Sequence, residues 1–248
     1  MRKLVLILLI AAAPFALADK RVHKTVPLDA NGSVVISTHN GTVTVTTWSQ
    51  PNVDIDARIE PVAGGDPADV DKTEVKISGS GSSVRIESDY DAVLPHMKWF
   101  SLSRDLPPVH YTISMPATAR LDVSGHNARV KVNGLRSDVN VESHNGPVDV
   151  VDFDGAANVE THNGDVSIGF NRFAKASRIE THNGSVQVTV PADTRLHVDA
   201  SGHHLGVESE LGVAATRVSD SHYSGDVNGG GPELRFESHN GTLRLKKR

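Results

Sequence analysis

The chain has 248 residues, of which 38% are hydrophobic, and its formal net charge at neutral pH is −5. It contains no cysteine, which excludes disulfides, thiolate zinc sites, a cysteine nucleophile and a cysteine-linked lipid anchor. The negative balance argues against a nucleic-acid binder, which needs a clustered basic face, and the length suits one continuous array or two small domains.

Residues 1–18 have the pattern of a secretory signal peptide. Arg2 and Lys3 precede an apolar run over residues 4–13, and Ala16-Leu17-Ala18 forms a small-x-small site with cleavage expected after Ala18. A membrane-spanning helix is the competing interpretation, but the run is short, the segment holds Pro14 and no basic stop-transfer segment follows. We therefore predict export to the periplasm, the cell surface or the extracellular space.

The N-terminal β region, residues 19–114, is predicted to consist of short strands. Apolar and polar residues alternate over 34–37, 42–48 and 53–59, as expected for strands with one buried face. Residues 61–71 are rich in Pro, Gly and Asp and are predicted to form a loop. Residues 74–78 and 83–88, joined by Gly79-Ser80-Gly81, form a candidate hairpin.

An insertion over residues 89–108 interrupts the strand pattern and carries Tyr90, Met97, Trp99 and Phe100 between prolines. One interpretation is that these large side chains cap the end or flank of the core, because aromatic residues usually serve burial. The alternative is an exposed aromatic loop in which Trp99 and Phe100 bind a carbohydrate or a partner protein, since recognition residues often lie on loops held by rigid scaffolds.

Residues 115–248 are repetitive, and we expect them to continue the N-terminal region without a break. The motif Ser/Thr-His-Asn-Gly occurs five times, with each copy followed by alternating apolar residues, and degenerate copies lie between. From His126 to His239 the successive turn histidines are 18, 18, 20, 21, 19 and 17 residues apart. Such a period, with no helical pattern, predicts an all-β solenoid with about 18–21 residues per coil and Asn-Gly turns. The closing lysines are expected to blunt its open end.

The alternation within one copy indicates which side chains face water. Val141 and Ser143 share one face of the strand, and Glu142 and His144 share the other. Because valine faces the core, glutamate and histidine face solvent, and Asn145-Gly146 supplies the positive φ angles of the turn. Stacking at about 4.8 Å should align the asparagines into a ladder. It should also align an acidic and an imidazole column: Glu142, Glu160 and Glu180 beside His144, His162 and His182.

Three interpretations of these columns stay open. In the first, the histidines and glutamates are structural, because ion-pair networks also gather titratable groups. In the second, His144, His162 and His182 with Glu142, Glu160 and Glu180 bind zinc, copper or nickel, for which imidazole and carboxylate are suitable ligands. In the third, the crowded imidazoles sense pH because they repel one another when protonated.

Enzyme signatures are weak, and we predict no catalytic residue and no cofactor. The sequence has no Gly-x-Ser-x-Gly elbow, no His-Glu-x-x-His helix and no phosphate-binding glycine loop. The calcium-binding nonapeptide of β-rolls is also missing. A polysaccharide-acting enzyme remains an alternative by analogy with other solenoids.

Together these features resemble the bacterial putative-adhesin family of β-strand-repeat proteins, a domain of unknown function. The resemblance rests on the leader, on the Pro-Ala-x-x-x-Leu-x-Val segments that begin at Pro116 and Pro191, and on the Asn-Gly turns between alternating valines. It implies a right-handed parallel β-helix outside the cytoplasm and no enzymatic activity. The histidine before each Asn-Gly and the insertion around Trp99 depart from the family pattern, so no functional residue is carried over.

We therefore predict an exported, non-enzymatic β-solenoid that serves as a structural or binding, adhesin-like module of the cell envelope. Its expected partners are a cell-surface glycan or an envelope protein, with no nucleic acid and no membrane span after the leader is removed. The alternative function is metal binding by the acidic and imidazole columns.

Overall fold

The computed structural model describes residues 19–94 and 106–248, and it is all-β. Residues 1–18, Met97, Trp99 and Phe100 lie outside the described residues, so the leader and the aromatic-loop hypothesis stay predictions. The described part contains one short helix, α1 (Ala68–Lys72), which lies within and just after the predicted loop, and these strands: β1 (Lys20–Trp48), β2 (Asn52–Ile59), β3 (Glu74–Asp89), β4 (Val109–Pro116), β5 (Arg120–Asn133), β6 (Val139–Asn145), β7 (Val148–Phe153), β8 (Ala157–Asn163), β9 (Val166–Phe170), β10 (Ser177–Asn183), β11 (Val186–Val190), β12 (Leu196–Ser209), β13 (Val213–Ser219), β14 (His222–Val227) and β15 (Glu233–Lys247).

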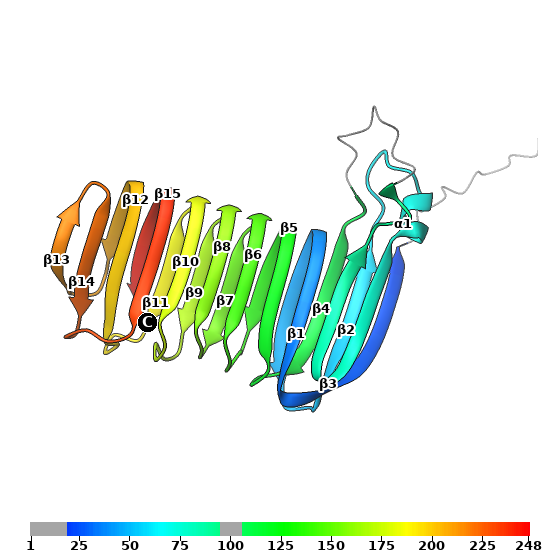
Figure 1. Ribbon diagram of the computed structural model, residues 1–248, viewed down its shortest axis with the longest axis horizontal. Helices are drawn as coiled ribbons and strands as arrows, with labels where there is room; N and C mark the ends of the chain where they lie inside the picture. The colour runs from blue at the N-terminus through cyan, green and yellow to red at the C-terminus, as the bar shows by residue number, and fades with distance from the viewer. Residues whose placement is uncertain (1–18, 95–105) are drawn as a thin grey trace, which may run out of the picture.

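The repeated segments form two walls of parallel strands in an elongated, solenoid-like stack (Figure 1). One wall contains β5, β6, β8 and β10, and the other contains the second half of β5, then β7, β9 and β11. Matching residues pair across the coils, as in Glu142↔Glu160 and Val148↔Val166. The predicted unit of strand, Asn-Gly turn and strand is therefore confirmed.

The last strand does not lie at the end of the stack, contrary to the sequence-based prediction. β15 lies between β10 and β12 on one wall and between β11 and β12 on the other. Lys246 and Lys247 pair with Thr189 and Val190 and do not blunt an open end. The end is instead formed by β12, β14 and β13, which pair antiparallel.

The corner asparagine explains this order. Asn240 of β15 pairs with Asn183 and continues the predicted amide ladder. At the same position β12 carries His204, which has no side-chain amide. A coil with Asn240 therefore fits beside Asn183 better than β12 does, and β12 takes the outer place.

The N-terminal region joins the same sheet through β1. The first segment of β1, Lys20 to Pro27, pairs antiparallel with β2, and its later segments pair parallel with β3, β4 and β5. The predicted hairpin at Gly79-Ser80-Gly81 is wrong. Both glycines have positive φ, at 88° and 70°, but β3 runs on as one strand, and Ser83 to Glu87 pairs with β1. The second arm pairs in parallel with β1 instead of with the first arm.

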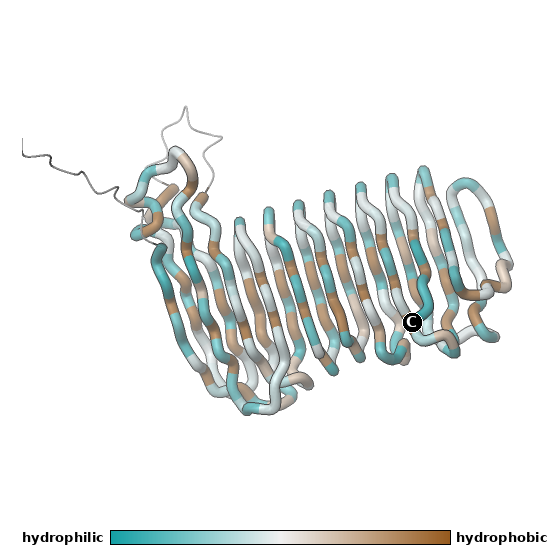
Figure 2. The backbone as a smooth tube through the Cα atoms, turned by 180° about the vertical axis from the view of Figure 1, so that it is seen from behind, coloured by the Kyte–Doolittle hydropathy of each residue, from teal (hydrophilic) through white to brown (hydrophobic). Residues whose placement is uncertain are grey.

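The core lies between the two walls and is made of the inward-facing residues of the alternating pattern. Figure 2 shows the hydrophobic positions as stripes that run along the stack. Val141, Val159 and Ile179 are at most 1% exposed, and burying each such side chain contributes roughly 1.5–3 kcal/mol. Tyr90 is buried too, and its hydroxyl donates a 3.0 Å hydrogen bond to the Pro107 carbonyl, which supports the capping interpretation for that part of the insertion. In the described ranges no helix is long and apolar enough to cross a bilayer.

Candidate functional site

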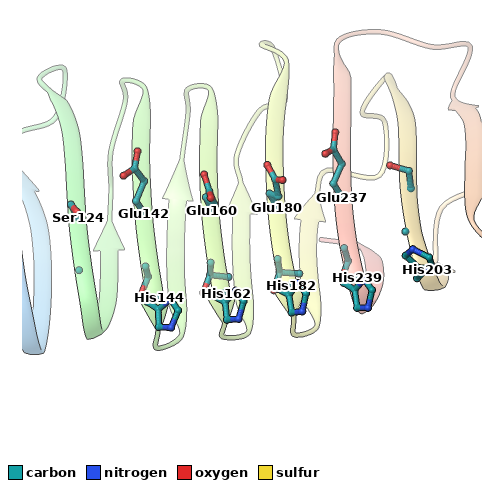
Figure 3. Close-up of a pocket in the computed structure, with 17 residues that line it drawn as sticks. Ser124, Glu142, His144, Glu160, His162, Glu180, His182, His203, Glu237 and His239 are labelled. Carbon is teal, nitrogen blue, oxygen red and sulfur yellow. The ribbon is translucent and has the colours of Figure 1, made fainter. Parts of the chain in front are cut away.

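The turn histidines form one continuous column on the outside of the stack. Neighbouring ring centroids are 4.6–4.8 Å apart, and the planes differ by at most 12° along the series from His39 to His239. The predicted neighbourhood of His144, His162 and His182 is therefore confirmed (Figure 3). At the far end His203 is tilted by 54°. We call this set the histidine column: His39, His126, His144, His162, His182, His239 and His203.

A ladder of amides holds the column in register. At each corner an asparagine donates from Nδ2 to Oδ1 of the asparagine in the preceding row, over 2.8–3.1 Å. The ladder ends where Asn40 donates to the Leu106 carbonyl over 3.1 Å. Because each histidine of the column except His203 directly precedes a ladder asparagine, the regular amide spacing fixes the spacing of the rings. The members of the amide ladder are Asn40, Asn127, Asn145, Asn163, Asn183 and Asn240.

The glycine after the asparagine allows the coils to stack closely. Gly146 has φ of +139°, and a Cβ placed there would lie 2.2 Å from the Ala128 carbonyl oxygen. Only glycine combines that φ with such a close approach. The corner at Gly146 therefore requires glycine, whereas Asn145 does not have the predicted positive φ and contributes through its side-chain amide.

A second column of carboxylates runs parallel to the first, two residues earlier in each strand (Figure 3). Glu142, Glu160, Glu180 and Glu237 pair directly across β6, β8, β10 and β15, and we call them the glutamate column. Arg178 Nη2 lies 2.9 Å from both Glu180 and Glu237. Glu142 and Glu160 form no ion pair with any described residue, so half of the column is uncompensated.

The two columns border a groove of about 690 Å³. In each row an inward-facing serine or threonine stands in the sequence between the glutamate and the histidine, and these residues line the same groove. Their oxygen atoms are buried and have no hydrogen-bond partner within the described protein, which typically costs about 1–3 kcal/mol for each unsatisfied group. These residues are Ser143, Thr161, Thr181 and Ser238.

Burial and repulsion between neighbouring rings disfavour protonation of two imidazoles of the column, His39 and His182. Burial, and then the neighbouring His126, lower the pKa of His39. Burial, and then His162 and His239, lower the pKa of His182. Among the carboxylates, burial and the nearby Glu142 raise the pKa of Asp122, against an opposing effect of Arg120.

At neutral pH this face is acidic. We define this face as the outward row of the glutamate column and the outward row two residues before it on β5, β6, β8, β10, β12 and β15, and these two rows hold six carboxylates and two guanidinium groups. No ion pair joins a column histidine to a column glutamate in the described ranges. The charged groups are Asp122, Glu142, Glu160, Glu180, Asp199, Glu237, Arg178 and Arg235.

The same geometry bears on the metal hypothesis for His144, His162, His182, Glu142, Glu160 and Glu180. Parallel rings direct their nitrogen lone pairs in the same direction, so adjacent imidazoles do not converge on one ion. Within 19–94 and 106–248, no group of three or more metal-binding side chains is placed to hold one. Calorimetric titration with zinc and copper tests the hypothesis. If it holds, the wild-type chain gives binding heat, and a variant with alanine at His144, His162 and His182 gives none.

Sequence reasoning missed a polar cluster on the terminal strands β12 and β14. His197 Nδ1 lies 2.7 Å from Asp226 Oδ1, and His197 Nε2 lies 3.3 Å from Ser224 Oγ. His222 and Asp199 form a second contact at 3.4 Å. These cross-strand pairs connect β12 to β14. The sequence pattern did not predict them, because the spacing of the repeat is irregular at this end.

The comparisons with known proteins agree with this architecture. The family described as Toastrack DUF4097 matches residues 10–246. A solved structure titled a putative cell adhesion protein from Clostridium sporogenes is 14% identical, with a TM-score of 0.55, covering 93% of this chain and 100% of that one. A putative adhesin from Bacteroides fragilis is also 14% identical, with a TM-score of 0.48, covering 92% of this chain and 97% of that one. No curated protein sequence matches significantly.

Proposed function

The chain belongs to the Toastrack DUF4097 family, and from that premise we propose that it is an exported, non-enzymatic, adhesin-like binding module of the cell envelope. The observation that carries this proposal is the groove between the histidine and glutamate columns, where the same exposed pair recurs row after row. A rigid surface with a regular repeat suits an extended partner, because little conformational freedom is lost on the protein side.

The charges define the chemistry of that partner. Glu142 and Glu160 are exposed carboxylates without ion-pair partners in the described protein, and the imidazoles beside them add hydrogen-bonding nitrogens. An extended partner with amino or other donor groups complements this surface, and electrostatic complementarity raises both the encounter rate and the specificity. We infer a basic segment of an envelope protein or an amine-bearing cell-surface glycan.

The location and the hand of the coil are part of the proposal. Residues 1–18 have the composition of a signal peptide, which supports a periplasmic or surface location. We infer that the stack coils as a right-handed parallel β-helix, because parallel strands in one sheet are joined by right-handed crossovers in about 98% of cases.

A binding experiment with a matched control tests the proposed surface. An immobilised oligolysine peptide serves as the extended cationic probe, its Nζ-acetylated form as the neutral probe, and a glycan array as the survey for natural ligands. We expect the full chain to bind oligolysine, and replacing both Glu142 and Glu160 by glutamine to weaken that binding by about tenfold.

The control is Asp149→Asn, which removes one carboxylate from the outward side of the opposite wall. It should leave binding unchanged. Equal binding by wild-type protein and the Glu142/Glu160 double variant would refute the groove as the contact surface. Absence of binding to every probe, including the array, would refute the binding function itself.

A further inference from the structure

A second groove of about 600 Å³ lies at the other corner of the coils, where the strands of the second wall end. It is bordered by the end of β1, the segment after β4 and the loop after β5. The groove is lined by an aromatic ring, amides, hydroxyls and an ion pair, and also by the apolar residues Ala30, Pro51 and Pro116. The histidine column lies beside the Asn-Gly corners, at the opposite end of these strands.

Trp48 forms a fixed wall of this groove. Its indole Nε1 donates a 2.9 Å hydrogen bond to the Asn52 carbonyl, and its backbone pairs with Pro116 in β4. The side chain is only partly buried, although nearly all other large aromatic residues of the described core are closed off from solvent. A partly exposed aromatic ring held in one orientation is the usual anchor of a binding site.

The charged groups of the groove neutralise each other. Arg136 Nη2 lies 3.0 Å from Asp152 Oδ2, and Asn171 Nδ2 donates to Asp152 Oδ1 over 2.5 Å. Both carboxylate oxygens of Asp152 are thus engaged. Asp152 also has φ of +53°, which is uncommon for a residue other than glycine and marks a conformation imposed by its surroundings. The groove therefore presents no free charge to an ionic ligand.

Uncharged hydrogen-bonding groups in the groove remain available. The side chains of Gln50, Asn133 and Thr46 are exposed and line the cavity, and none of them hydrogen-bonds to another described residue. Two amides and a hydroxyl supply both donors and acceptors. With the ring of Trp48, they match a ligand that has an apolar face and an edge of hydroxyl groups.

We propose that the Trp48 groove binds a neutral oligosaccharide. A sugar ring offers a C–H face to the indole and hydroxyls to the amides of Gln50 and Asn133, and the groove has the size of a small-ligand site. This site is separate from the groove proposed above and does not depend on it.

Tryptophan fluorescence of the full chain tests this proposal. The chain has two tryptophans, so a Trp99→Phe background leaves Trp48 as the single reporter. Cellotetraose, maltotetraose and tetra-N-acetylchitotetraose are the neutral probes, and an oligogalacturonate is the charged comparison. We expect at least one neutral probe to give a saturable change in indole emission and the oligogalacturonate to give none.

Two variants and two controls assign the signal to the groove. Gln50→Ala and Asn133→Ala replace exposed side chains that bond to no other described residue, so both should fold normally and weaken binding by up to about tenfold each, as expected for one lost hydrogen bond. Gln187→Ala, on the outward side of β11, should bind as the background protein does. The Glu142/Glu160 glutamine variant should also keep saccharide binding, which separates this site from the first groove.

Three results would overturn the proposal. One is the absence of a fluorescence change and of calorimetric heat with all three neutral probes. Another is unchanged affinity in both Gln50→Ala and Asn133→Ala. The third is equal binding of the oligogalacturonate, which a groove without free charge does not explain.

Discussion

The imidazole rings of the histidine column are close enough that each protonation affects its neighbours. His182 lies between His162 and His239 at 4.6 and 4.8 Å, with Glu180 and Arg178 on its own strand. The second and third largest causes of its lowered pKa are those two histidines, after burial. Neutral rings can stack at this spacing, whereas protonated rings repel.

This arrangement predicts that stability falls in weak acid. The pKa values of His39 and His182 are lowered in the folded state from the ordinary value near 6.5. The unfolded chain therefore binds more protons than the folded chain just below that pH, so this stability is full above about pH 6.5 and is lost as the pH falls from there through the lowered folded-state pKa values. We expect a lower melting temperature at pH 5 than at pH 8.

A variant identifies the groups responsible. Replacing His39 and His182 by asparagine should reduce the difference in melting temperature between pH 5 and pH 8. The lowered pKa values of Asp138 and Asp152 change stability only below their ordinary value near 3.8, and the raised pKa of Asp122 favours the folded chain in acid, so none of these carboxylates causes the expected loss. Equal melting temperatures of the wild-type chain at the two pH values would contradict the prediction.

The corner glycine gives a second prediction at the residue scale. Gly146→Ala places a methyl group against the Ala128 carbonyl at a φ of +139°, so we expect a loss of about 2 kcal/mol or more in the free energy of unfolding. Gly212→Ala is the control, because no atom lies within 4 Å of its added Cβ. Urea denaturation of both variants measures the difference. If Gly146→Ala leaves the free energy of unfolding unchanged, the coils can move apart at little cost.

At the scale of the strands, β15 connects the parallel stack to its antiparallel end. Phe236 of β15 is fully buried and pairs with Ile179 on one side and Ala200 on the other. Removing its ring leaves a cavity at the junction, and Phe→Ala changes in cores typically cost about 3–5 kcal/mol. We expect Phe236→Ala to increase amide hydrogen exchange in β12 and β14 before it does so in β6 and β8.

Val218→Ala is the matched control, because Val218 is 71% exposed on β13 and its loss should leave exchange unchanged. Uniform acceleration of exchange along the whole chain in Phe236→Ala would mean that the stack unfolds as one unit, contrary to a local role for β15.

Most of the stack could be predicted from the sequence, because valines alternate with polar residues and Asn-Gly recurs at a regular spacing. The parity of Val141, Glu142, Ser143 and His144 correctly predicted which side chains face solvent. The place of β15 could not be predicted from a period, because chain order does not determine spatial order. The missing asparagine at His204 was the available signal. The Trp48 groove escaped notice because loops from distant segments build it.

At the scale of the whole molecule, the histidine column places a pH-dependent charge along the acidic face. At neutral pH that face carries six carboxylates against two guanidinium groups. Protonating imidazole groups in weak acid adds positive charge beside the glutamates, and the lowered pKa values of His39 and His182 move their protonation to lower pH. Oligolysine keeps its charge over this range because lysine titrates near 10.4.

Binding of oligolysine should therefore weaken between pH 7.5 and pH 5, and raising the salt concentration should weaken it at either pH, since surface charges are screened over about 10 Å at 0.1 M ionic strength. A variant with asparagine at His144, His162 and His182 keeps a polar side chain in each row but cannot be protonated there. Its binding should change less with pH than that of the wild-type chain. If the variant loses affinity in acid as strongly as the wild type, the titrating groups are not these imidazoles, and the acidic face acts independently of the histidine column.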